Sequence, residues 1–187
     1  MRSLLERGGR NAVLDVPQGP DTSSERAEQR LRELGIDLPR PPTPLGAYVE
    51  SVRSGNLLFL SGTLPVEGGV PKFQGRIGSD LSIEDGQRAT RLAALNALAL
   101  AKQALVSLDN VSRVVRLGVS LVTTVEFREH PKVADAASEL LVSVFGAEKI
   151  STRLVYGVAS LPVGVCVVIE TIFEVSDVAH TTSVSRE

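Results

Sequence analysis

The sequence predicts an α+β domain in which two long helices cover one face of a sheet. Residues 82–108 carry leucines at helical spacing among many alanines, and residues 131–146 repeat apolar side chains with the same period. Residues 112–125 instead alternate, with valine and leucine on one parity and polar or small side chains on the other. Both kinds of pattern leave one apolar surface to bury, and packing the helices on the sheet buries both surfaces together.

The remaining strands are expected in two pairs, one on each side of these elements. Residues 48–52 and 57–61 flank the turn signal Ser54-Gly55-Asn56, which predicts a β-hairpin. Residues 151–158 and 166–175 form the second pair, separated by a Leu161-Pro162 break. The first long helix begins at a capping-box-like segment, residues 82–85. We therefore expect a single sheet with both helices on one face.

A chain of 187 residues has room for one domain with a substantial core. Residues 1–33 are rich in polar residues and glycine and are expected to form an N-terminal extension with one short helix near its end. A proline-rich connector opens the folded domain, residues 34–176, and residues 177–187 are expected to form a polar tail. Function is expected in the middle segment.

The composition excludes several classes of function. The formal net charge is -2 and no run of Lys or Arg exceeds two residues, so nucleic acid is not an expected partner. No apolar run approaches the length of a membrane helix, and the lone cysteine, Cys166, predicts a reducing compartment, the cytoplasm. Neither His130 nor His180 has neighbours at metal-ligand spacing, so no metal and no cofactor are expected.

Arg153 is the most informative residue because it stands in a segment that otherwise predicts a buried strand. A guanidinium stays charged in proteins, so it needs an anionic partner or open space. Arg153 is therefore either one half of a structural ion pair or a receptor for an anion, and the pattern by itself leaves both readings open.

Strand parity gives an expectation for the opposite face of the sheet. If Leu154, Tyr156 and Val158 lie under the helices, then Arg153 shares the other face with Cys166, Val168, Glu170, Ile172 and Glu174. Such a face is too apolar to remain wholly in water, and no helix is left to cover it. We expect a homo-oligomer in which sheets pack together, with Arg153 at or near the contact between copies.

These residues resemble the Rid family, the reactive-intermediate deaminases also called RidA or YjgF proteins, some of which carry the older label L-PSP endoribonuclease. The likeness covers about residues 34–176, in a subgroup with an N-terminal addition. The matching motifs agree in order and spacing; they are Gly35-Ile36-Asp37-Leu38-Pro39, Tyr48, Gly55-Asn56, Phe59-Leu60-Ser61-Gly62, Asn96, Val144-Phe145-Gly146, Arg153, Gly157-Val158 and Leu161-Pro162. The resemblance implies a chorismate-mutase-like homotrimer with ligand clefts between subunits.

The resemblance also implies a chemistry. The arginine at the position of Arg153 binds the carboxylate of a 2-imino or enamine acid, and water converts the imine to a 2-keto acid and ammonia without a cofactor. Tyr48 and Ser61 match cleft positions, although Tyr48 could equally be ordinary strand packing and Ser61 a turn residue. The expected function is a deaminase that acts on small imino acids, with Arg153, Tyr48 and Ser61 as its site.

One departure from the family pattern opens an alternative. The family's water-orienting glutamate lies fifteen residues after the arginine, where this chain has Val168, and Glu170 is displaced from that position by about 6.6 Å. Asp135-Ala136 also stands where the subgroup usually has Asn-Gly. The alternative is a non-catalytic trimeric binder of a small carboxylic metabolite. RNA cleavage rests only on the older family label, and the acidic charge balance weighs against it.

Overall fold

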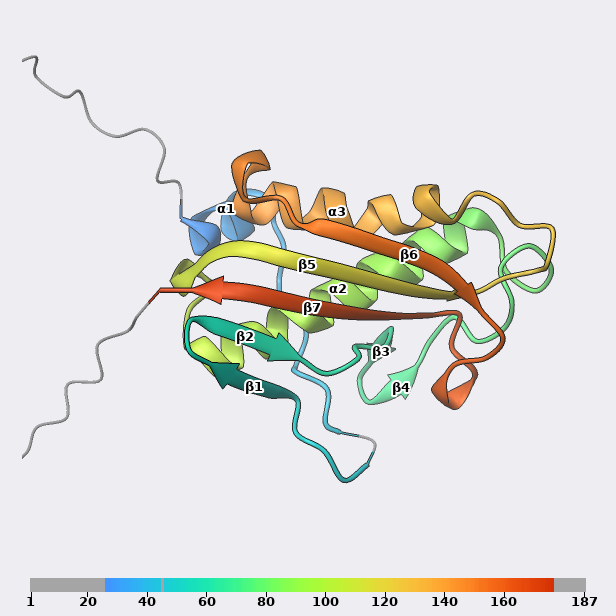
Figure 1. Ribbon diagram of the computed structural model, residues 1–187, viewed down its shortest axis with the longest axis horizontal. Helices are drawn as coiled ribbons and strands as arrows, with labels where there is room; N and C mark the ends of the chain where they lie inside the picture. The colour runs from blue at the N-terminus through green and yellow to red at the C-terminus, as the bar shows by residue number, and fades with distance from the viewer. Residues whose placement is uncertain (1–25, 45, 177–187) are drawn as a thin grey trace, which may run out of the picture.

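The computed structural model describes residues 26–44 and 46–176. Its centre is a five-stranded mixed sheet with the strand order β1-β2-β7-β5-β6, and a separate two-stranded ribbon, β3-β4, lies beside one end (Figure 1). Two long helices, α2 and α3, lie side by side behind the strands in this view. The expected α+β layer with both helices on one face is confirmed.

Five strands lie at or near the expected segments, whereas the short strands β3 and β4 were not expected, and of the strand pairs in the described residues only β5 and β6 run parallel. Their bounds are β1 Ser51–Ser54, β2 Leu57–Leu60, β3 Val66–Glu67, β4 Val70–Pro71, β5 Val111–Val122, β6 Thr152–Val158 and β7 Val167–Val175. The β1-β2 hairpin turns at Gly55, which has a positive φ of 59° that costs glycine little. β1 and β6 are the two edge strands of the sheet.

The helices are α1 Ala27–Glu33, α2 Ile83–Leu105 and α3 His130–Phe145. Ser82 and Asp85 form a reciprocal capping box at the start of α2, as the sequence predicts. Alanines 89, 93, 94, 97 and 101 of α2 are buried, and these small side chains allow the close packing of α2 on α3 and the sheet. None of the helices among the described residues has the length and apolar character needed to cross a membrane.

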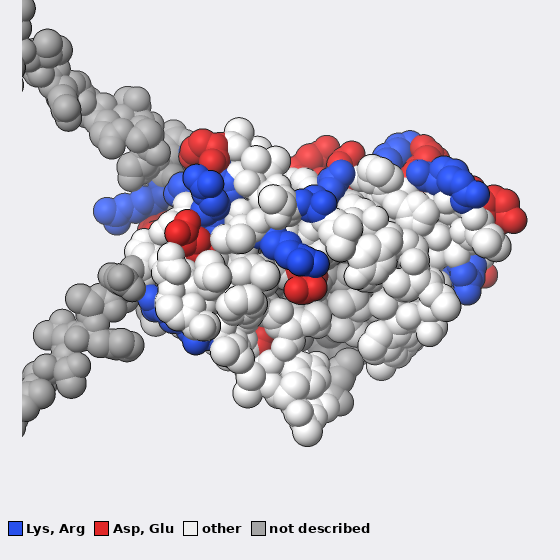
Figure 2. Space-filling model, in the orientation of Figure 1, with Lys and Arg blue, Asp and Glu red and all other residues white. Residues whose placement is uncertain are grey.

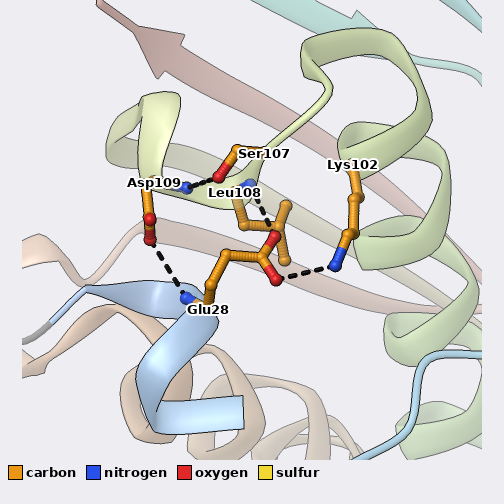
Figure 3. A network of polar contacts seen from close by, with 5 residues as sticks. All are labelled: Glu28, Lys102, Ser107, Leu108 and Asp109. Carbon is orange, nitrogen blue, oxygen red and sulfur yellow. Dashed lines mark hydrogen bonds and ion pairs between the residues drawn. The ribbon is translucent and has the colours of Figure 1, made fainter. Parts of the chain in front are cut away.

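The short helix α1 is anchored to the domain by a polar network (Figure 3). The Glu28 carboxylate accepts a hydrogen bond from Lys102 Nζ at 2.7 Å and another from the backbone N–H of Leu108 at 3.1 Å. The backbone N–H of Glu28 donates to Asp109 Oδ1 at 3.0 Å. Leu31, one turn further along α1, is buried in the core, so apolar and polar contacts act together to hold this helix.

The structure corrects the expected orientation of β6. Arg153 pairs in register with Leu117, and Val155 with Val119, and both β5 partners are buried beneath the helices. Arg153 therefore lies on the helix face. The expectation that Leu154 and Tyr156 lie under the helices is wrong, because these side chains are on the other face and are 47% and 48% exposed. As an edge strand, β6 has both faces partly in solvent, so its mixed composition gave no reliable parity.

Cys166 is a second correction to the expected face. It was expected to share the open face with Val168, but it is fully buried and belongs to the hydrophobic core. The backbone departs from strand alternation just before β7, where Val165, Cys166 and Val167 are all fully buried. The N–H of Cys166 donates to the carbonyl of Phe73 in a neighbouring loop, and the carbonyl of Cys166 accepts from the N–H of Val122 at the end of β5.

We call the surface of the sheet that faces away from the helices the open face. Among the described residues its largest exposed apolar side chains are Val52, Phe59, Leu154 and Tyr156. Figure 2 looks onto the sheet from the viewpoint of Figure 1, and most atoms over the strands belong to uncharged residues. An apolar sheet surface of this kind is typical of an interface with another protein surface.

Candidate functional site

A cleft lies at the end of the β1-β2 hairpin, where the chain leaves β2. Tyr48, Ser61, Gly62 and Leu64 are shared by two adjoining hollows, and we call the whole the Ser61 cleft. The strand-side hollow continues along Leu161, Pro162 and Val168. The proline-side hollow continues along Pro42, Thr43, Pro44, Glu50 and Leu100, among others. Tyr48 and Ser61, both expected at a ligand site, thus line one continuous depression.

Ser61 is held in place by its own strand partner. Its backbone N–H donates to the carbonyl of Glu50 at 2.9 Å, and its hydroxyl donates to the carbonyl of Val49 at 2.7 Å. The hydroxyl proton is therefore used within the hairpin, while the oxygen lone pairs remain able to accept a hydrogen bond. Ser61 is arranged to accept an N–H or water proton, and it is not arranged as a nucleophile activated by a base.

Gly62, which follows β2, and Val168 of β7 form the floor of the strand-side hollow. A Cβ atom added at Gly62 would lie 3.0 Å from Cγ1 of Val168, closer than ordinary van der Waals contact. A larger residue at position 62 would require the Val168 side chain to shift by a few tenths of an ångström. The strand-side hollow is consequently bounded by an alkyl group at position 168, and no carboxylate projects into it from that strand.

The wall formed by Leu64 is fixed from the core by Asn96 of α2. This amide is 1% exposed and donates from Nδ2 to the carbonyls of Leu64, at 2.9 Å, and Val66, at 2.8 Å. The Leu64 carbonyl lies in the loop that leads from the cleft, and the Val66 carbonyl lies at the start of β3. A buried amide that satisfies both carbonyls gives this segment a defined position. The motif residue Asn96 therefore has a structural role at the cleft.

Glu50 is a cleft residue that the sequence reasoning missed. It lies opposite Ser61 in the hairpin, is half-buried, and lines the proline-side hollow. The available signal was the alternation of Tyr48, Glu50 and Val52, which places all three on one face of a strand. Charged residues on an edge strand are usually solvated, and for that reason the pattern drew no attention to Glu50.

Arg153 lies apart from the Ser61 cleft within one chain. It is on the edge strand β6, which is separated from β2 by the two strands β7 and β5, and it lies on the opposite face of the sheet. At a strand spacing of about 4.8 Å, β2 and β6 are separated by roughly 14 Å. Arg153 Nη1 donates to Asp135 Oδ1 at 2.6 Å and to Ser138 Oγ at 3.0 Å, both on α3. The ion-pair reading of this arginine is thus observed, and the cleft reading requires a second copy.

The other residues with reactive side chains lie outside the cleft. Burial raises the pKa of the Cys166 thiol to about 11, so the thiolate is scarce near neutral pH. His130 begins α3 and contacts the Thr123 hydroxyl at 3.2 Å, and burial followed by the nearby Arg128 charge lowers its pKa. No group of three or more metal-ligating side chains occurs among the residues that the structure describes. His180 lies outside the described residues.

The fold agrees with comparisons to known proteins. Residues 28–175 match the model of the family described as "YjgF/chorismate_mutase-like, putative endoribonuclease". The match spans nearly the whole described domain, and the chain therefore belongs to the YjgF family, as the motifs around Ser61 and Arg153 predict.

Individual relatives match most of the chain as well. Protein TCP17 of Trypanosoma cruzi is 38% identical over 156 residues, which cover 83% of this chain and 98% of the relative. The crystal structure of Atu1372 from Agrobacterium tumefaciens, a protein of unknown function, has 38% identity and a TM-score of 0.74, covering 80% of this chain and 92% of that one. The crystal structure of a Shewanella oneidensis protein described as a "putative endoribonuclease" has 33% identity and a TM-score of 0.77. The match covers 80% of this chain and 99% of that one.

Proposed function

We propose that this protein hydrolyses small 2-imino or enamine acids to 2-keto acids and ammonia. The observation that carries the proposal is the Ser61 cleft: an aromatic wall at Tyr48, a hydroxyl oxygen at Ser61 and the close approach at Gly62 meet in one depression of a YjgF-family chain. A site of this size suits a small, flat molecule. The proposed chemistry works by positioning of the substrate and by proton transfer.

The proposed site is completed by a second copy of the chain. Arg153 is on the edge strand β6 and Ser61 directly follows β2, with β7 and β5 between them, and the two residues lie on opposite faces of the sheet, so one chain cannot direct both at the same small ligand. Packing of open faces in a homotrimer would cover the exposed apolar side chains and bring the β6 edge of one copy toward the hairpin end of its neighbour. Arg153 then anchors a carboxylate at a cleft whose other wall belongs to the neighbour.

The roles of the residues follow from their chemistry. A guanidinium binds a carboxylate with parallel hydrogen bonds, and both observed contacts of Arg153 use Nη1, so a ligand can take the Nε and Nη2 donors while Asp135 remains bound. Ser61 Oγ accepts from the iminium N–H, and the Tyr48 ring packs on the flat imine. Water adds to C2, a proton moves to nitrogen, and the carbon–nitrogen bond breaks to give keto acid and ammonium.

The test generates 2-iminobutyrate in situ and measures the release of 2-oxobutyrate with and without the protein. Wild type is expected to accelerate release, while Arg153→Ala and Ser61→Ala slow it toward the uncatalysed rate. The matched control is Arg91→Ala, which removes an exposed arginine of α2 far from the cleft and should leave the rate unchanged. Equal rates with and without wild-type protein would refute the deaminase.

One observation motivates a second candidate. The alkyl group of Val168 bounds the hollow where the family resemblance implies a carboxylate, and a cleft without turnover would still bind a small carboxylic metabolite. Saturable binding of 2-oxobutyrate that requires Arg153, together with no acceleration of imine hydrolysis, would establish this binder. In either case we propose a reducing compartment, the cytoplasm, since the lone Cys166 remains a buried free thiol.

A further inference from the structure

Hydrolysis of an imine needs a group that accepts a proton from the attacking water, and Val168 cannot do so. This inference deepens the proposed function and rests on it. Among the residues that line the two hollows of the Ser61 cleft, Glu50 is the single carboxylate in the described part of the chain. Glu50 is therefore the candidate proton acceptor within the cleft.

Glu50 is aimed at the same space as Ser61. The bond from the N–H of Ser61 to the carbonyl of Glu50 continues the register in which Ser51 faces Leu60, so Glu50 and Ser61 are direct cross-strand neighbours. Side chains of such neighbours leave the sheet on one face, with Cβ atoms about 5 Å apart. The Glu50 carboxylate can thus reach a water molecule that is also in contact with the Ser61 hydroxyl.

The surroundings of Glu50 indicate a functional role for its carboxylate. Its hollow is lined mainly by apolar groups, including Leu64, Val66 and Leu100, and the side chain is half-buried. Within residues 26–44 and 46–176 the Glu50 carboxylate makes neither a hydrogen bond nor an ion pair. Desolvating a carboxylate without a partner is unfavourable, and groups of this kind are enriched at functional sites.

We propose that Glu50 is the general base of this enzyme, replacing from the hairpin the carboxylate that position 168 lacks. The Glu50 carboxylate removes one proton from water as the water oxygen bonds to C2 of the iminium, whose C=N electron pair moves to nitrogen. The same proton then passes from Glu50 to the amine of the carbinolamine. Ammonia leaves as the hydroxyl of the carbinolamine becomes the keto group, and its proton converts ammonia to ammonium.

Glu170 is the competing carboxylate and is less well placed. It projects from β7 on the open face beside Gly118, is exposed, and lines neither hollow of the Ser61 cleft. A carboxylate that lies outside the cleft has no fixed position relative to the reacting carbon. The two residues make different predictions when each is changed to its neutral isostere.

The experiment compares Glu50→Gln, Glu170→Gln and, as a control outside the cleft, Glu67→Gln in the imine assay across pH. Glu50→Gln should lower kcat about 100-fold or more while the Kd for 2-oxobutyrate changes less than about 3-fold, because general bases contribute that much to rate. The pH profiles of wild type and Glu50→Gln should differ, because the variant lacks the carboxylate that transfers the proton. Glu170→Gln and Glu67→Gln should retain both rate and pH profile.

The outcomes separate this inference from the proposed function. An active wild type with a fully active Glu50→Gln variant overturns the inference alone, as does a loss confined to Glu170→Gln. A wild type without any acceleration overturns the proposed function and the role of Glu50 together. Unchanged thermal unfolding of Glu50→Gln, and partial recovery of rate in Glu50→Gln combined with Val168→Glu, would support a direct chemical role over a structural one.

Discussion

Arg153 on β6 and Asp135 on α3 form an ion pair, with 2.6 Å between Nη1 and Oδ1, on the helix face at the edge of the sheet. The guanidinium that is proposed to anchor a substrate carboxylate is therefore already in contact with a carboxylate of its own chain. A ligand must either share the guanidinium with Asp135 or displace it. The affinity of the site for small acids is thus set partly by this internal competitor.

Asp135→Asn should tighten the binding of 2-oxobutyrate, because the neutral amide competes less well for the guanidinium. The side chains of Arg153 and Asp135 are 26% and 49% exposed, and pairs of this kind contribute little to stability. Affinity should rise about 5-fold, while the free energy of unfolding falls by less than about 1 kcal/mol. Calorimetric titration and urea unfolding measure the two. Glu139→Gln, on the same helix, is the control, and equal affinities in wild type and Asp135→Asn would contradict the competition.

Val168→Glu should raise the rate of imine hydrolysis. The substitution places a carboxylate on the wall of the strand-side hollow, near Gly62 and Ser61. We expect a gain in kcat/KM of roughly 10-fold, within the range that a positioned acid–base group supplies. The in-situ imine assay measures it, with Val168→Gln as the isosteric control. A gain of the same size in Val168→Gln would show that shape, and not proton transfer, is responsible.

Light scattering at micromolar concentration should give three times the chain mass of 19.9 kDa. The exposed Leu154 and Phe59 lie on the open face that is proposed to pack against other copies. Leu154→Asp would bury a charge in that interface, so the variant should dissociate to single chains. Val106→Asp, at a residue 85% exposed after α2, is the control and should not change the mass. A wild-type mass near 19.9 kDa would refute the trimer.

Glu28→Gln should destabilise the protein in a pH-dependent manner. Burial alone would raise the pKa of Glu28, but hydrogen bonds from Lys102 and the Leu108 backbone outweigh burial and lower the pKa below its ordinary value of 4.5. The stabilisation is present above pH 4.5 and is lost as the pH falls through the lowered folded-state pKa. At pH 7 the variant should lose about 1 kcal/mol, the usual value for such a hydrogen-bonded pair.

Urea unfolding of wild type and Glu28→Gln at pH 7 and at pH 3 measures this dependence. The difference between the two proteins should shrink at the lower pH, because below the ordinary pKa of 4.5 the unfolded wild type takes up a proton at Glu28 and the advantage of the lowered folded-state pKa declines. A difference that stays constant across this range would mean that packing of α1, and not the carboxylate charge, accounts for the loss. Asp37→Asn is a suitable control outside the network in Figure 3.

The fold was largely predictable from sequence because its elements bury one face each. α2 and β5 were both located to within a few residues. β5 alternates between core and surface from Leu117 onward, but register shifts before that point put Val114 in the core where the sequence pattern predicted Val115. β6 was located but oriented wrongly. Its residues Leu154 and Tyr156 are apolar yet exposed, as expected for an edge strand whose far face awaits another surface, and single-chain hydropathy cannot distinguish that from burial.

The candidate site was predictable in part. The sequence motif brought Tyr48 and Ser61 to attention, and the structure places them in one cleft. Glu50 was missed because cross-strand neighbours depend on register, which local patterns do not give. The partner of Arg153 could not be predicted from the sequence either, because the contact with Asp135 depends on how α3 packs against β6. Contacts between residues on different elements can be assigned only when the tertiary packing is known.

The amide of Asn96 has a consequence for how variants of this protein will be interpreted. It holds the two carbonyls from inside the helix layer, so the position of Leu64 in the cleft wall is inherited from α2. A change at Asn96 would therefore displace the wall without touching any ligand. A mutational screen that measures activity alone would class Asn96 among the ligand contacts. The Asn96 side chain is nevertheless buried in the protein and is not accessible to a ligand in solution.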